Sequence, residues 1–285
     1  MAMSNRIMRR RQGLSKGVYI FPNLCTTASL FCGFFSVVKS LSAQPIAAAW
    51  AILLAGVFDL LDGRVARLTH SESEFGIEYD SLVDLASFGL APGILIYTWS
   101  LYGLGKIGWL AAFLYFACGA MRLARYNLQH NTIETKKFQG LPIPVAAYVL
   151  ATYVIFYHNF FMTPIIGSVF VLLMTVALAL LMVSSIAYPS FKQLDFKRKR
   201  SFFVLVLFVF GLFFVALKPE ETMFVLVVAY VLYGVFYEAF MLYKKMGSKT
   251  SLSDQNKEAR DNHTIVDDGG ETIADIAPAK QNDRL

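Results

Sequence analysis

A succession of apolar segments, each long enough to cross a lipid bilayer, limits what this 285-residue chain can fold into. The hydrocarbon core of a bilayer is crossed by about 20 apolar residues in a helix, the form that satisfies its own backbone hydrogen bonds. We therefore predict an all-α fold, a polytopic transmembrane helix bundle with about eight spans. The defensible range is six to eight, because the seventh segment is short and residues 142–187 divide in more than one way. The expected spans are 18–38, 46–66, 79–102, 107–127, 142–160, 164–187, 202–217 and 222–243.

Composition supports a membrane protein and weighs against a nucleic-acid partner. Hydrophobic residues make up 56% of the chain and aromatic residues 15%, far above the usage of a soluble domain. The net charge of +6 comes from short basic clusters between apolar runs, as in cytoplasmic membrane loops. The three cysteines lie within apolar runs and indicate neither a disulfide framework nor a zinc site.

Basic residues alternate from loop to loop, which predicts the topology. They gather in residues 1–17, in the loops around 64–67, 122–137 and 192–200, and at 244–249. The opposite loops contain only Lys39, Lys106 and Lys218. Because cytoplasmic loops are enriched in Lys and Arg, both termini are expected in the cytoplasm.

The two ends of the chain differ from its apolar middle. Residues 1–17 are predicted to be a basic cytoplasmic segment. The next apolar run is longer than the apolar region of a signal peptide and lacks an A-x-A site, so we expect a retained first helix. Residues 18–246 form the expected transmembrane domain. Residues 247–285 are polar and predict a disordered cytoplasmic tail.

Four acids interrupt the apolar pattern. Asp59 and Asp62 end the second expected span, and Asp80 and Asp84 begin the third. Each pair, three or four residues apart, shares a helix face, and a short turn brings both pairs to one depth. Four carboxylates at membrane depth repel one another unless a cation neutralises them. Oxygen ligands without His or Cys predict a divalent metal, Mg²⁺ or Mn²⁺, as one or two ions, and Ca²⁺ would also fit.

A simpler interpretation treats these acids as helix-end residues. Asp59 and Asp62 would then pair with Arg64 or Arg67, and the other two acids would be interfacial. This accounts for any one aspartate better than for two matched pairs.

The spacing of these residues resembles the signature of the CDP-alcohol phosphotransferases. The matching string is Asp59-x2-Asp62-Gly63-x2-Ala66-Arg67-x8-Gly76-x3-Asp80-x3-Asp84. The resemblance implies that Asp59, Asp62 and Asp80 are metal ligands and that Asp84 is the general base, counted among the metal ligands as well. It also implies that a CDP site is lined by Gly63, Ala66, Arg67 and Gly76.

Weaker motifs around the signature resemble the bacterial and archaeal phosphatidylserine synthases of this family. They occupy residues 21–26, 87–93, 124–127 and 140–144, and the similarity covers about 18–245. The resemblance implies phosphatidyl transfer from CDP-diacylglycerol to L-serine by a homodimer. It also implies a location among the lipids of the prokaryotic cytoplasmic (inner) membrane, with the active site facing the cytoplasm.

Four flanking residues have two interpretations each. Asn23 and Thr26 either cap a helix start or join the CDP site. Arg122 and Arg125 either mark a cytoplasmic helix end or bind a lipid phosphate or the serine carboxylate.

The signature leaves the acceptor alcohol open. Glycerol phosphate, inositol phosphate and choline are alternatives to serine. A divalent-cation transporter is a different class, but it has no need of Gly63, Ala66 and Arg67, and a fixed Arg opposes cation entry. A non-catalytic scaffold would have no need of four acids.

Overall fold

The computed structural model describes residues 20–69, 74–130, 140–161, 165–184, 186, 218–238 and 240. All regular elements within these ranges are helical, which confirms the all-α fold. The expected segments 1–17, 202–217 and 247–285 lie outside the described residues. The chain divides into two compact units, Met1–Phe236 and Tyr237–Leu285, and the packing described below belongs to the first.

Six of the described helices are long and apolar enough to cross a membrane, which indicates an integral membrane protein. This number falls within the predicted range of six to eight. The six stretches are Asn23–Leu41, Pro45–Val65, Phe75–Trp99, Lys106–Leu128, Ile143–Phe161 and Pro219–Glu238.

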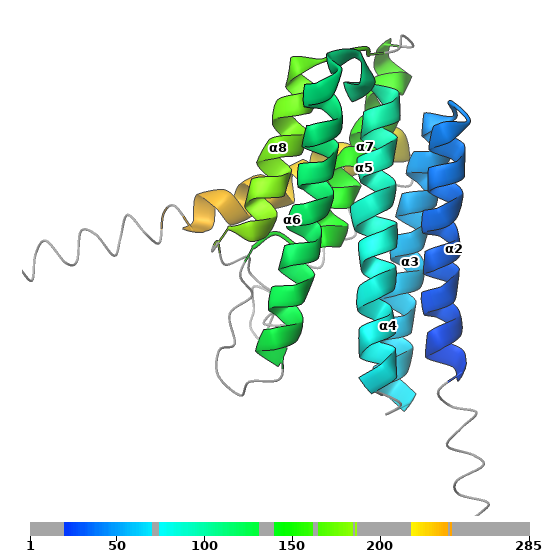
Figure 1. Ribbon diagram of the computed structural model, residues 1–285. Coiled ribbons are helices and arrows are strands. Elements are labelled where there is room, and N and C mark those ends of the chain that lie inside the picture. Colours follow the sequence, from blue (N-terminus) through cyan, green and yellow to red (C-terminus); the bar gives the residue numbers. More distant parts are fainter. Residues whose placement is uncertain are drawn as a thin grey trace, which may run out of the picture. The chain divides into compact units, whose positions relative to one another are not determined.

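Helices α2 (Ile20–Leu41) and α3 (Pro45–Thr69) lie side by side in opposite directions (Figure 1). Their close packing follows from the alanines at the start of α3, since small side chains let two helix backbones approach. Ala48 and Ala49 are fully buried. Lys39, in the last turn of α2, reaches the connection between the helices, where its Nζ donates a hydrogen bond of 2.9 Å to the Gln44 Oε1.

The third membrane-spanning stretch is one continuous helix that contains a π-helical segment. It consists of α4 (Glu74–Asp84), the π-helix η1 (Leu85–Leu90) and α5 (Ala91–Trp99). Proline at position 92 lacks the N–H that would donate to the Phe88 carbonyl in a regular α-helix. The hydroxyl of the fully buried Tyr115 donates to that carbonyl instead, at 3.1 Å. The π-helix therefore begins directly after Asp84 and is stabilised by a side chain from another helix.

Helix α2 shapes the other side of this turn. A Cβ at Gly33 would lie 2.5 Å from the Ser87 Oγ, so only glycine allows this approach. The Ser87 hydroxyl in turn donates to the Ser29 carbonyl at 3.1 Å. The irregular turn is thus packed between α2 and the helix that carries Tyr115.

Helices α6 (Lys106–His130), α7 (Ile143–Phe161) and α8 (Val169–Val183) follow, with α6 along α8 and α7 against α3 (Figure 1). Helix α8 has 15 residues and is shorter than the expected span 164–187. Its start is capped by Ser168, whose Oγ accepts from the Val171 N–H. Its end meets Leu141, whose N–H donates to the Leu181 carbonyl at 3.0 Å.

The glycine that precedes Leu141 is required by this junction. Gly140 has φ +86°, and an added Cβ would overlap the Met182 carbonyl oxygen. We expect Gly140→Ala to destabilise the protein by about 2 kcal/mol, because left-handed backbone and steric overlap both oppose alanine. Gly105→Ala is the control, since Gly105 also has positive φ but no atom within 4 Å of the added Cβ. Thermal unfolding in detergent measures both variants, and equal midpoints would contradict the steric part of the prediction.

Candidate active site

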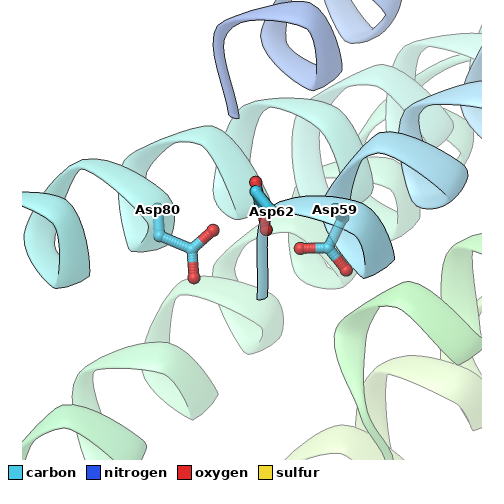
Figure 2. Close-up of side chains that lie close together, drawn as sticks. All are labelled: Asp59, Asp62 and Asp80. Carbon is cyan, nitrogen blue, oxygen red and sulfur yellow. The ribbon is translucent and has the colours of Figure 1, made fainter. Parts of the chain in front are cut away.

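Three of the four predicted acids meet between α3 and α4. Asp59 and Asp62 lie one turn apart in the second half of α3, and Asp80 lies in α4. One carboxylate oxygen from each lies within 4.8 Å of the other two. In Figure 2 the Asp59 and Asp80 carboxylates point toward each other, with Asp62 between them. The antiparallel helices therefore place the two acidic pairs at one depth.

Asp62 is the most buried of the three, with 6% of its surface exposed. The Thr26 hydroxyl and the backbone N–H of Gly63 donate hydrogen bonds to its carboxylate. Its Oδ2 is buried and, within the described residues, accepts no hydrogen bond. A buried anionic oxygen without a donor is costly, so this atom is suited to a cation.

Asp84 lies one turn beyond Asp80 and adjoins the cluster from the same helix. The carboxyl groups of Asp84 and Asp59 are hydrogen-bonded to each other. Two carboxyl groups this close repel each other unless a proton or a cation lies between them. Asp84 is thus beside the three-oxygen cluster without belonging to it.

The cluster fits a divalent metal of the hard, oxygen-binding kind. All three ligand atoms are carboxylate oxygens. Oxygens around one Mg²⁺ lie about 3–4 Å apart, so small side-chain rotations would let one ion touch all three. The unpartnered Asp62 Oδ2 supports the same fit.

Helix α6 places the positively charged side chain of an arginine near the site. Arg122 is half-buried and lies within electrostatic reach of Asp84. Its Nε is buried, and in the described part of the chain it has no hydrogen-bond partner. The Asn127 Nδ2 donates to the Ser81 Oγ at 3.1 Å, which ties this end of α6 to α4. Arg125, the other predicted arginine, is exposed.

The first described helix contributes Thr26, and the structure decides against helix capping for it and for Asn23. Helix α2 extends to Ile20 at least, so both residues lie inside the helix and cannot be its N-cap. Thr26 binds Asp62 directly, as described above. The carbonyl of Asn23 accepts a hydrogen bond of 2.7 Å from the Thr27 hydroxyl.

For the remaining residues of the predicted CDP site, we describe the position of the backbone in its helix. Gly63, Ala66 and Arg67 follow Asp62 along α3, and Gly76 lies in the first turn of α4. The side chains of Ala66 and Arg67 lie outside the described residues, so their assignment stays a prediction.

Sequence reasoning missed one residue near the acids. Tyr148 of α7 lies against Gly56, one turn before Asp59, and within electrostatic reach of Asp59 and Asp84. No spacing rule identifies a tyrosine in an apolar helix. The only available signal was Gly56 itself, which follows the alanines and leucines of the first half of α3.

Comparison with known proteins places the chain in a family. A profile of CDP-alcohol phosphatidyltransferases matches residues 19–187. The CDP-diacylglycerol–serine O-phosphatidyltransferase of Helicobacter pylori is 38% identical over 232 residues, 81% of this chain and 96% of that protein. The enzyme of that name from Bacillus subtilis is 36% identical over 173 residues, 60% of this chain and 91% of its own. The archaetidylserine synthase of Methanothermobacter thermautotrophicus is 38% identical over 170 residues, 59% of this chain and 69% of its own.

Proposed function

The chain belongs to the CDP-alcohol phosphatidyltransferase family, and we propose that it transfers the phosphatidyl group of CDP-diacylglycerol to the hydroxyl of L-serine, releasing CMP. The observation that carries this proposal is the meeting of Asp59, Asp62 and Asp80 beside Asp84, at the signature positions. Enzymes of this family generally depend on a divalent metal, and the three-carboxylate cluster fits one.

The proposed reaction forms one phosphorus–oxygen bond and breaks another. The serine hydroxyl oxygen attacks the lipid-bearing phosphate, and the bond from that phosphate to CMP breaks. Asp84 takes the proton from the attacking hydroxyl. Asp59, Asp62 and Asp80 would hold the metal, Mg²⁺ or Mn²⁺, as one or two ions. When bound, it would neutralise the charge that builds up on the diphosphate as CMP leaves.

The other site residues would bind either the nucleotide or the lipid phosphate and serine. Gly63, Gly76 and Ala66 are small and would let the nucleotide approach the backbone, while the planar guanidinium of Arg67 would bind a phosphate. Thr26, which binds Asp62, and Asn23 would border the nucleotide. Arg122 and Arg125 would bind the lipid phosphate or the serine carboxylate. Arg122 is the better candidate, because its buried Nε has no hydrogen-bond partner among the described residues and it lies near Asp84.

Serine is the acceptor that the relatives favour. Both bacterial relatives are named for transfer to serine, and the archaeal relative is named for an archaetidylserine product. These names agree on the headgroup and differ in the lipid. We choose a diacylglycerol lipid because the Helicobacter pylori relative, which covers 81% of this chain, is named for it.

The position of the acids supports a cytoplasmic site. They lie toward the end of α3 away from its connection to α2, near which Lys39 lies in the last turn of α2. Arg64, near that end of α3, and Arg122, in the second half of α6, lie at the acid-bearing end. By the positive-inside rule this end faces the cytoplasm of a prokaryotic inner membrane. The homodimer implied by the family resemblance stays a prediction.

An acceptor assay tests the proposal. We expect purified protein with CDP-diacylglycerol and Mn²⁺ to release CMP when serine is added, because serine supplies the attacking hydroxyl. Parallel reactions contain glycerol phosphate, inositol phosphate or choline, and a reaction without alcohol measures hydrolysis. CMP release with glycerol phosphate but not with serine would overturn the acceptor. Metal uptake into proteoliposomes without CMP release under any condition would favour a transporter.

A further inference from the structure

Tyr148 lies outside the family signature, yet α7 places its hydroxyl within electrostatic reach of Asp59 and Asp84. The tyrosine is half-buried, and its ring meets the fully buried Phe88 edge to face, with centroids 6.0 Å apart and an interplanar angle of 85°. Phe88 belongs to the π-helix that follows Asp84. The ring of Tyr148 is therefore oriented by the same irregular turn that adjoins the predicted base.

A glycine makes room for the hydroxyl on α3. Gly56 precedes Asp59 by one helical turn, and a Cβ added at Gly56 would overlap the Tyr148 hydroxyl oxygen. The hydroxyl also lies within electrostatic reach of the Asp59 and Asp84 carboxylates. Thus α3 and α4 supply the Asp59–Asp84 pair, and α7 places a phenol against α3, within electrostatic reach of both acids.

The chemistry of a phenol beside carboxylates indicates its role. A tyrosine hydroxyl is neutral at cellular pH and can donate one hydrogen bond, whereas ionised carboxylates can only accept. Donors that orient metal-binding carboxylates usually matter, and their removal typically costs about 10–100-fold in metal affinity or activity.

We propose that Tyr148 is a positioning residue of the Asp59–Asp84 pair, with a hydroxyl that donates a hydrogen bond to these carboxylates and orients them for cation binding and proton transfer. Gly56 is the second part of this arrangement, because any larger residue would displace the hydroxyl. The inference rests on the metal centre and the function proposed above.

The test compares two tyrosines of α7. Tyr148→Phe removes the hydroxyl and keeps the ring. Tyr153→Phe is the matched control, because Tyr153 is 8% exposed and its ring packs on Trp99 at 5.8 Å, in a separate aromatic cluster. Each purified protein is titrated with Mn²⁺ in a calorimeter, without substrate, and the titration gives its affinity for Mn²⁺. We expect Tyr148→Phe to bind Mn²⁺ about tenfold more weakly and to lose turnover to a similar extent. Tyr153→Phe should match the wild type.

A merely structural role would lower the thermal midpoint without changing Mn²⁺ affinity, and this outcome would overturn the proposal. If Tyr148→Phe does not fold, Gly56→Ala provides the second test, since it keeps the tyrosine and displaces its hydroxyl. Wild-type Mn²⁺ affinity in folded Gly56→Ala would likewise overturn the proposal. The titration uses no alcohol or CDP-lipid. Failure of the serine assay would therefore count against the proposed function alone, and an unchanged titration against Tyr148 alone.

Discussion

Asp84→Asn is expected to remove turnover while the protein remains folded. A positioned general base contributes about 10²–10⁴-fold to a rate, so kcat for CMP release with serine should fall by at least about 100-fold. The amide keeps the size of the side chain and can donate a hydrogen bond to Asp59, but it cannot accept the proton of the attacking hydroxyl. Excess Mn²⁺ should not restore activity, because the three-oxygen cluster remains in place.

Glu78→Gln is the matched control for this variant. Glu78 lies in α4, is exposed and is not part of the cluster, so loss of its charge should leave kcat unchanged. Near-normal turnover by folded Asp84→Asn would refute the assignment of Asp84 as the base. A comparable loss in Glu78→Gln would instead point to a nonspecific effect of charge on α4.

The features that sequence predicts well here depend on local rules. Apolar runs of about 20 residues predict the long helices because the bilayer fixes their length. The intervals from Asp59 to Asp62 and from Asp80 to Asp84 predict shared faces because the helical repeat is fixed. The antiparallel connection then brings Asp59, Asp62 and Asp80 together, as the structure describes.

The features that sequence does not predict depend on partners from distant segments. The π-helix after Asp84 could be suspected from proline at 92, but its position also requires the Tyr115 hydroxyl and the close approach of Gly33. The end of α8 depends on Leu141, which is 40 residues away in sequence from its hydrogen-bond acceptor Leu181. Hydropathy reports neither contact, because it averages over neighbours in sequence.

The helix-cap interpretation of Asn23 and Thr26 illustrates the same limit. Polar residues near the start of an apolar run are ordinary N-cap candidates, and the pattern alone leaves capping and a place in the CDP site equally open. The structure extends α2 to Ile20 and directs Thr26 to Asp62, an acid on the neighbouring helix. The role of Thr26 is thus decided by packing between helices.

Asp62→Asn is expected to weaken metal binding strongly and, at ordinary Mn²⁺ concentrations, to remove most of the activity. Asp62 contributes the most buried carboxylate of the cluster, and its Oδ2 has no hydrogen-bond partner among the described residues. Wild-type protein should be stabilised by Mn²⁺, by about 2.7 kcal/mol at a concentration of 100 times Kd. The variant should lose most of this stabilisation, because an amide oxygen carries no charge to attract the cation.

Without metal, Asp62→Asn should not lower the thermal stability of the protein. A buried carboxylate without a cation or a full set of donors is costly, so Asp62→Asn should unfold at the same temperature as metal-free wild type or above it. Thermal unfolding with and without Mn²⁺ measures both effects, with Glu78→Gln again as the control. An unchanged Mn²⁺-dependent shift in Asp62→Asn would contradict its role as a ligand. Partial recovery of CMP release at high Mn²⁺ would separate this variant from Asp84→Asn, in which the lost group accepts a proton and no added metal can replace it.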